Sequence, residues 1–161
     1  MPPTRTRLER VTEQMGTDLA LLYAQHGGFF EDADLAAGRT EKSGFDVDLK
    51  RVGGIETLTQ AVANRLKTRR GELADLGHPT YGSRHHELIG EPNVQRTRDL
   101  IKLYVLQALR DEPRIARVVK VDVLPEHVPP RETVRIELTV TVIDAPVPLN
   151  LIVPFSLGPS L

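Results

Sequence analysis

The tetrapeptide Asp111-Glu112-Pro113-Arg114 separates two kinds of sequence pattern and thereby decides the fold. Before it, apolar residues recur with the period of a helix, and after it they alternate with the period of a strand. Pro113 ends a helix because it lacks a backbone N–H and its ring clashes with the preceding turn. It also favours an extended conformation for Glu112. We therefore expect a rigid corner, in which a carboxylate and a guanidinium flank one fixed residue.

This corner has two interpretations. An arginine fork binds a carboxylate or backbone carbonyls with defined geometry, which suits docking onto a partner protein better than it suits catalysis. The alternative is a helix stop with a surface ion pair, which contributes little energy. The local sequence alone favours this second interpretation.

Two long amphipathic helices are predicted before the corner. The first follows Gly53-Gly54 and stops near Gly71, with an acid near its start and bases near its end, as the helix dipole favours. Its apolar stripe is Ile55, Leu58, Val62 and Leu66. The second begins near Pro92 and ends at Arg110-Asp111. Its buried face is expected to contain Val94, Thr97, Ile101, Tyr104, Val105 and Ala108. Between the helices, the glycines and prolines of 77–83 predict defined turns, which Tyr81 could anchor to the core.

Three apolar-alternating runs follow the corner, at residues 119–123, 134–142 and 147–155. The middle run alternates without interruption, which is typical of an antiparallel strand with one solvated face. The last run contains Pro148 and Pro154, which confine it to a sheet edge. Such an edge offers unpaired backbone groups to another chain. The same sequence also fits an edge that prolines protect and that has no partner.

The order of these elements indicates an α+β fold in which two long helices pack on a small antiparallel C-terminal sheet. Residues 1–47 are predicted to form a partly irregular N-terminal arm, and residues 48–161 the α+β domain. Within the arm, the run 19–23 is compatible with either a helix or a strand. No internal repeat is evident.

Composition excludes several classes of protein. The absence of cysteine excludes disulfides and thiolate metal sites. The 21 basic and 22 acidic residues give a formal charge of −1, which argues against nucleic-acid binding. No apolar run approaches the roughly 20 residues of a membrane span, and the N-terminus lacks the apolar region of a signal peptide. We expect a soluble intracellular protein.

Catalytic and metal-binding patterns are weak. His78, His85 and His86 with Glu87 match no familiar zinc spacing, and surface or capping histidines are the favoured interpretation. A glycosidase needs two carboxylates on either side of the scissile bond, and nothing in the sequence pairs the available ones. These are Glu72, Glu87, Glu91 and Glu112. No nucleophile-elbow, phosphate-loop or dinucleotide-binding motif is present. We predict no enzymatic activity, no cofactor and no metal.

A series of short motifs runs from Gly16-Thr17-Asp18-Leu19 to the last strand. They are Asp48-Leu49, Gly53-Gly54-Ile55-Glu56-Thr57-Leu58, Gln60-Ala61, Arg65-Leu66 with Thr68, Arg70-Gly71-Glu72-Leu73, the turn 77–83, Ala108-Leu109 and Glu112-Pro113-Arg114. In this order and at these spacings they resemble the sheath-initiator (baseplate wedge) proteins of contractile tails. That family occurs in contractile phages, type VI secretion and extracellular contractile injection systems. Its most characteristic motif is the Glu-Pro-Arg triplet.

The resemblance implies a structural role in a baseplate around the tail tube or hub, with one copy per wedge and six per particle. Glu112, Pro113 and Arg114 would dock on the core of the wedge proteins, with Pro113 holding the two charges apart. The C-terminal edge would join strands of the first sheath protein ring and start sheath assembly. Its residues would be Val147, Leu149, Leu151, Val153 and Phe155. Assembly would be cytoplasmic, before incorporation into a phage-tail-like particle.

Two alternatives stay open. The family is often labelled lysozyme-like, so a peptidoglycan-degrading tail enzyme is one of them, although no catalytic pair carries over to this sequence. The other is a small adaptor that binds through its edge strand.

Overall fold

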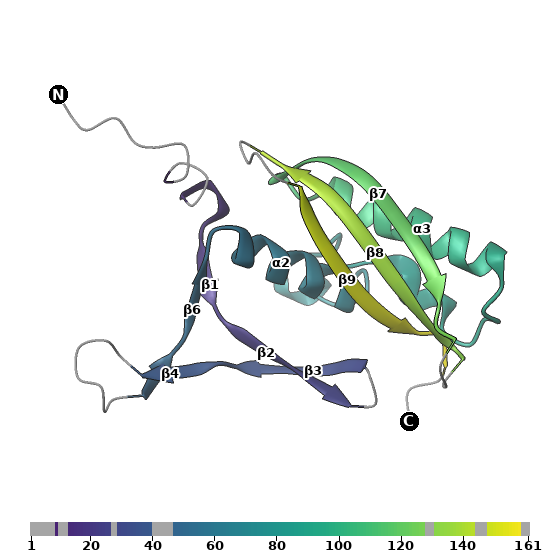
Figure 1. Cartoon of the computed structure of the whole chain (residues 1–161), viewed down its shortest axis with the longest axis horizontal. Coiled ribbons are helices and arrows are strands. Elements are labelled where there is room, and N and C mark those ends of the chain that lie inside the picture. Colours follow the sequence, from purple (N-terminus) through teal and green to yellow (C-terminus); the bar gives the residue numbers. More distant parts are fainter. Residues whose placement is uncertain are drawn as a thin grey trace. The chain divides into compact units, whose positions relative to one another are not determined.

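The C-terminal part of the chain contains a three-stranded antiparallel sheet (Figure 1). The computed structural model describes residues 9, 13–26, 29–39, 47–127, 131–143 and 148–158. The strands are β7 (Ile115–Pro125), β8 (Thr133–Val142) and β9 (Leu149–Ser156), in the order β7-β8-β9. The central strand β8 buries one face completely, which confirms the alternation predicted for it. The buried residues are Val134, Ile136, Leu138, Val140 and Val142.

The two edges of this sheet differ. The pairing of β7 with β8 shifts between Ile115 and Arg117 and again between Val118 and Lys120. Such bulges increase the local twist and interrupt the edge. Strand β9 pairs with β8 in one unbroken register over its whole length. The sheet therefore has one irregular edge, β7, and one regular edge, β9.

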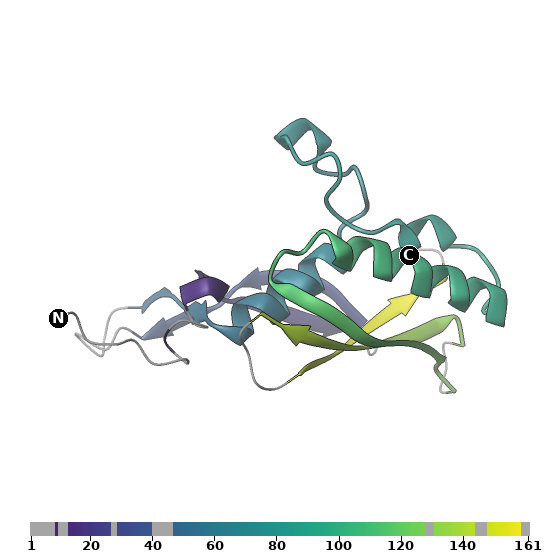
Figure 2. The ribbon, with the colours of Figure 1, turned by 90° about the horizontal axis from the view of Figure 1, so that it is seen from above.

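Helix α3 (Gln95–Arg110) packs against β7 and lies on one face of the sheet (Figure 2). It buries Thr97, Ile101, Val105, Ala108 and Leu109. The helix begins three residues after the predicted Pro92, because Val94 adopts an extended conformation at its N-cap. Val94 is consequently exposed, although the pattern placed it on the buried face.

Helix α2 (Ile55–Lys67) is the other helix of seven or more residues in the described part of the chain. Its predicted stripe is buried at Leu58, Val62 and Leu66, whereas Ile55 in the first turn is exposed. The chain is thus a mixed helix and strand protein with small antiparallel sheets, as predicted. That both helices pack on the C-terminal sheet stays a prediction, since the main packing observed is that of α3 on β7. None of the described helices is long and apolar enough to cross a membrane.

A loop between α2 and the short helix η2 (Arg84–Leu88) projects away from α3 and the sheet (Figure 2). It contains the single turn η1 (Ala74–Leu76). Two backbone hydrogen bonds close its neck, from Arg70 N to Ser83 O (3.1 Å) and from Ser83 N to Thr68 O (2.9 Å). Gly82 is required there, because its φ is +95° and a Cβ atom would lie 2.6 Å from Thr68 O. The defined turns predicted for this stretch are present.

The chain forms two compact units, Met1–Gln60 and Ala61–Leu161. The described part of the first unit is built from short strands, and the run 19–23 is extended rather than helical. The strands are β1 (Thr17–Leu19), β2 (Leu21–His26), β3 (Phe29–Leu35), β4 (Ala37–Arg39), β5 (Val47–Leu49) and β6 (Arg51–Gly53). They pair antiparallel as β1-β6, β2-β3 and β4-β5. The division into an arm at 1–47 and a domain at 48–161 stays a prediction.

A ring of three backbone hydrogen bonds joins these strand pairs. Ala20 N donates to Lys50 O, Lys50 N to Ala36 O, and Ala36 N to Ala20 O, each at 2.8 Å. An aspartate two residues before each junction residue accepts a hydrogen bond from the next N–H at 2.7–2.8 Å. The repeated tripeptides are Asp18-Leu19-Ala20, Asp34-Leu35-Ala36 and Asp48-Leu49-Lys50. The first unit therefore contains a short internal repeat. It is not evident from the sequence alone, because each copy is only three residues long.

Candidate functional site

The chain changes from helix α3 to strand β7 at the corner, as its sequence predicts. Glu112 N donates to Leu109 O at 3.1 Å, in the last turn, and Ile115 N donates to Glu112 O at 3.1 Å, where β7 begins. The chain therefore changes from helix to strand within the tetrapeptide. Pro113 lies exposed at the turn.

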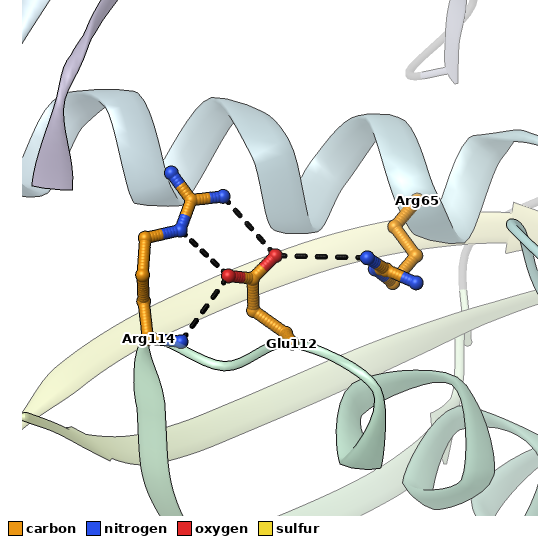
Figure 3. A network of polar contacts seen from close by, with 3 residues as sticks. All are labelled: Arg65, Glu112 and Arg114. Atoms are coloured by element: carbon orange, nitrogen blue, oxygen red, sulfur yellow. Dashed lines mark hydrogen bonds and ion pairs between the residues drawn. The ribbon is translucent and has the colours of Figure 1, made fainter.

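Glu112 and Arg114 pair with each other across this turn (Figure 3). Arg114 Nε donates to Glu112 Oε1 at 2.6 Å and Nη2 donates to Oε2 at 3.1 Å, a two-pronged geometry. The backbone N–H of Arg114 also donates to Oε1, at 3.3 Å. The sequence leads to the expectation that Pro113 holds the two charges apart. In the structure it does not, because Glu112 and Arg114 pair directly within the turn that contains Pro113.

A second cation, Arg65 in the last turn of α2, approaches the same carboxylate (Figure 3). Its Nη2 lies 3.7 Å from Glu112 Oε2. The guanidinium also lies over the ring of Tyr81, 4.5 Å from its centroid, which is a cation–π contact. The corner network of Arg65, Glu112 and Arg114 therefore ties α2 to the start of β7, and Tyr81 anchors the projecting loop to it.

Exposure differs sharply within the corner network. The side chain of Glu112 is 5 % exposed, that of Arg65 11 % and that of Arg114 25 %. Burial alone would raise the pKa of Glu112, but the hydrogen bonds and charge of Arg114, helped by Arg65, hold that pKa below its ordinary value. The carboxylate therefore stays ionised at neutral pH. The surface groups at this corner are Pro113 and the outer part of Arg114.

Arg65 is not among the predicted site residues, although Arg65-Leu66 belongs to the series of motifs in the sequence. The usable signal was its position on α2, directly before the buried Leu66 and one turn from Val62. A charged residue beside the apolar stripe of a helix needs a partner when the stripe is covered. Which carboxylate supplies it depends on the fold.

The adjacent histidines are not surface residues, so that part of the prediction is wrong for His85. Its side chain is 1 % exposed, and a hydrogen bond of 2.7 Å joins Nδ1 to Ser83 Oγ. His86 stacks on it with ring centroids 4.3 Å apart and donates from Nε2 to Leu66 O at 2.8 Å. Phe155 of β9 contacts His85 edge-on at 4.5 Å. Ser83, His85 and His86 form a histidine cluster inside the C-terminal unit.

Burial, and then the neighbouring His86, lower the pKa of His85 to about 3, so the ring is neutral at physiological pH. Burial also lowers the pKa of His86. Among the residues that the structure describes, no group of three or more His, Asp or Glu side chains could hold a metal ion. Both rings contact Phe155 edge-on within the C-terminal unit.

The four candidate carboxylates have separate surroundings. Glu72 Oε2 accepts from Arg69 N at 2.9 Å, and Glu87 forms an exposed ion pair with Arg84 at 2.9 Å. Glu91 is exposed, and Glu112 belongs to the corner network. A glycosidase acid needs a raised pKa, whereas the pKa values of Glu87 and Glu112 are lowered by their arginine partners.

Leu149, Leu151, Val153 and Phe155 of the predicted sheath-pairing residues lie on β9. The fifth, Val147, lies outside the described residues. Val153 and Phe155 are buried, and Leu149 and Leu151 are half-buried. Their side chains therefore belong to the sheet's own core face. What the edge presents to another chain is backbone.

Comparisons with known proteins agree with this picture. A protein from Geobacter sulfurreducens, provisionally identified as a tail lysozyme, has a crystal structure that covers 66 % of this chain and 94 % of its own, at 27 % identity and a TM-score of 0.57. A chain in the baseplate complex of the type VI secretion system shares the fold at 23 % identity and a TM-score of 0.50, over 63 % of this chain and 92 % of its own. A search of curated proteins found no match. The family profile described as Baseplate wedge protein gp25 matches residues 53–147, which include both helices and the corner. The chain belongs to this baseplate wedge family, and this membership supports a role as a structural component of a baseplate.

Proposed function

We propose that this protein docks on the core of the baseplate wedge through its corner and starts sheath assembly through the free edge of β9. Six copies, one per wedge, would surround the tail tube or hub. Assembly would take place in the cytoplasm, before incorporation into the particle. The region 48–161, with both long helices against the sheet, would be the unit that carries these contacts.

The docking step is supported by the geometry at Arg114. Its guanidinium is held by two hydrogen bonds to a buried carboxylate, so little side-chain freedom is lost when a partner binds. One quarter of the side chain is exposed beside the exposed Pro113. Arg114 and Pro113 would contact the wedge protein, which would offer a carboxylate or backbone carbonyls. Glu112 would position the arginine rather than reach the partner.

The sheath-initiating step is supported by the regular edge of β9. Addition of a strand to a free sheet edge is a common mode of protein recognition, in which main-chain hydrogen bonds supply the affinity. The bulged edge of β7 is less suitable. The single observation that carries the whole proposal is the family match over 53–147, which places the corner inside a baseplate wedge protein.

The proposal is tested by replacing the gene in the producing strain with a tagged copy that carries Arg114→Lys. This change keeps the positive charge but removes the fork geometry. We expect recovery of wedge proteins in affinity purification, measured by mass spectrometry, to fall about tenfold, the effect of losing one charge-assisted hydrogen bond. Arg84→Lys, in an exposed ion pair, is the matched control. Normal recovery of wedge proteins with a folded Arg114→Lys variant would contradict docking through this corner.

Peptidoglycan cleavage is the second candidate, favoured by the likeness to the provisional tail lysozyme. Purified natural protein and a Glu112→Gln variant would be incubated with peptidoglycan, and released fragments measured by mass spectrometry. We expect no release from either. Release that depends on one carboxylate would overturn the structural proposal. A soluble monomer without wedge or sheath partners would instead favour an edge-strand adaptor.

A further inference from the structure

The backbone groups of β9 alternate between β8 and the free edge, and the hydrogen bonds at the end of the strand show which is which. Leu157 N donates to Glu132 O at 2.9 Å, on the side of β8. Thr133 O accepts from Glu126 N at 3.0 Å, on the side of β7. Because the register of β9 with β8 is unbroken, odd-numbered residues of β9 direct N–H and C=O toward β8. Even-numbered residues direct theirs toward the free edge.

Both prolines of this segment have even numbers. Pro154 lies within β9, so the N–H that it lacks would have faced the free edge and the protein's own sheet loses no hydrogen bond there. Pro148 directly precedes β9 and has the same parity, so continuation of the strand by one residue would direct its position to the free edge as well. Between them, Asn150 and Ile152 keep their donors. The free edge thus presents carbonyls along its length, but between the two prolines it presents N–H donors only at Asn150 and Ile152.

We propose that Asn150 and Ile152 fix the register in which a sheath strand adds to this edge, and that Pro148 and Pro154 exclude the neighbouring registers. The inference rests on the proposed sheath-initiating function. A five-residue antiparallel strand that is centred opposite Leu151 exchanges both backbone hydrogen bonds with Asn150 and with Ile152 and ends before either proline. A shift by two residues places one of its carbonyls opposite a proline, where it finds no donor.

The same prolines select against a second copy of this chain. Symmetric antiparallel pairing of two β9 strands about Leu151 would place Pro148 of one copy opposite Pro154 of the other, where neither supplies an N–H. When two copies of β9 pair, both strands lack the N–H groups of their prolines. When β9 pairs with a proline-free strand of the same length, only β9 lacks these donors. The edge therefore favours a strand without proline at these positions, which prevents uncontrolled edge pairing.

The side chains indicate the chemistry of that strand. Ile152 is 58 % exposed and lies opposite Glu137 on the solvated face, and Asn150 lies opposite Thr139. A β-branched or aromatic residue beside Ile152 would form a favourable cross-strand pair. On the other face, apolar residues would extend the row of Leu151 and Val153. The partner is thus a strand of about five residues with alternating polarity, matching the usual strand length.

The decisive variant is Ile152→Pro, introduced into the gene of the producing strain. It removes one N–H from the free edge and none from the pairing with β8, so the protein stays folded, which circular dichroism of the purified chain verifies. We expect the yield of sheathed particles, counted by negative-stain electron microscopy, to fall at least about tenfold. Ile152→Thr, which keeps the N–H, is the matched control and should assemble normally. Leu151→Pro removes an inward N–H and should unfold the sheet.

A second measurement concerns self-association. The double variant Pro148→Thr/Pro154→Thr restores both donors, and we expect dimers by light scattering at concentrations at which the natural protein is monomeric. Continued monomers would overturn the selection against a second copy. Normal sheath yield with folded Ile152→Pro, or an equal loss with Ile152→Thr, would overturn the register inference. Deletion of the gene separates this from the proposed function: sheathed particles in the deletion strain would contradict sheath initiation itself.

Discussion

Two polar clusters lie buried in the C-terminal unit, and they solve the problem of burial in opposite ways. The corner network keeps its charges: Glu112 is ionised and faces two guanidiniums and a backbone N–H. In the histidine cluster, by contrast, His85 is uncharged, and its near neighbours are a hydroxyl, a second imidazole and an aromatic ring. A buried group retains charge only where opposite charges and donors replace water.

The difference also separates recognition from packing. The corner network reaches the surface through Arg114, the residue that we propose contacts the wedge protein. The histidine cluster packs between η2, the end of α2 and Phe155 of β9, with His85 and Ser83 fully buried. Four measurements test this difference between the two clusters.

The largest effect is expected for Glu112→Gln. The change keeps the shape of the side chain but leaves two arginines, one almost fully buried, without their counter-charge. We expect the free energy of unfolding to fall by about 3 kcal/mol in urea denaturation at pH 7. Glu87→Gln, in an exposed pair, should show no measurable change. A loss under about 1 kcal/mol would mean that the network does not depend on the charge of Glu112.

The histidine cluster should produce a pH dependence. The pKa of His85 is lowered to about 3 in the folded protein, so the unfolded chain takes up the proton first as pH falls. The contribution is present above the ordinary pKa of about 6.5 and is lost as pH falls toward 3, by at most about 1.4 kcal/mol per pH unit. Between pH 6.5 and 5 we expect a loss of about 2 kcal/mol, and His86 adds to it.

His85→Gln removes this titration while keeping a polar group that can hydrogen-bond Ser83. Its unfolding free energy should therefore depend less steeply on pH over the same interval. Denaturant titrations of both proteins at several pH values provide the comparison. Equal slopes would show that His85 is already protonated or exposed in the folded state, against the enclosure described above.

Arg114→Lys should have a smaller effect on stability than on docking. The ammonium keeps a charge near Glu112 but cannot form the two-pronged contact, and the site is partly solvated. We expect a loss of about 1 kcal/mol in urea denaturation. A loss as large as that of Glu112→Gln would indicate that Arg114 acts in folding alone and would weaken the separation of recognition from packing.

Pro113→Ala should have the smallest effect. Pro113 is exposed and contributes mainly by restricting the unfolded chain, so we expect a loss of about 0.5–1 kcal/mol by thermal and urea denaturation. A larger loss would mean that the turn itself holds Glu112 and Arg114 together. In that case the double variant Pro113→Ala/Glu112→Gln would lose less than the sum of the two single changes.

The fold was predictable where local pattern decides it. The stripe of α2, the stop at Pro113 and the uninterrupted alternation of β8 each depend on residues close in sequence, and all three are present. The N-terminal strands were missed because their runs are short and their junction depends on the carbonyls of distant residues, as in the hydrogen bond from Ala20 N to Lys50 O. The burial of His85 was likewise not predictable, because the residues next to it in sequence are polar.

Three features could be read from the residues alone: the corner at Pro113, the change from helical to strand period there, and the edge position of a strand with prolines at 148 and 154. These follow from covalent geometry and side-chain periodicity, which need no distant partner. Three other features became visible only in the folded chain. Arg65 shares the carboxylate of Glu112, the charges of Glu112 and Arg114 pair rather than stand apart, and the edge donors are Asn150 and Ile152. Burial and hydrogen-bond direction set these features, and both arise when segments far apart in the chain pack together.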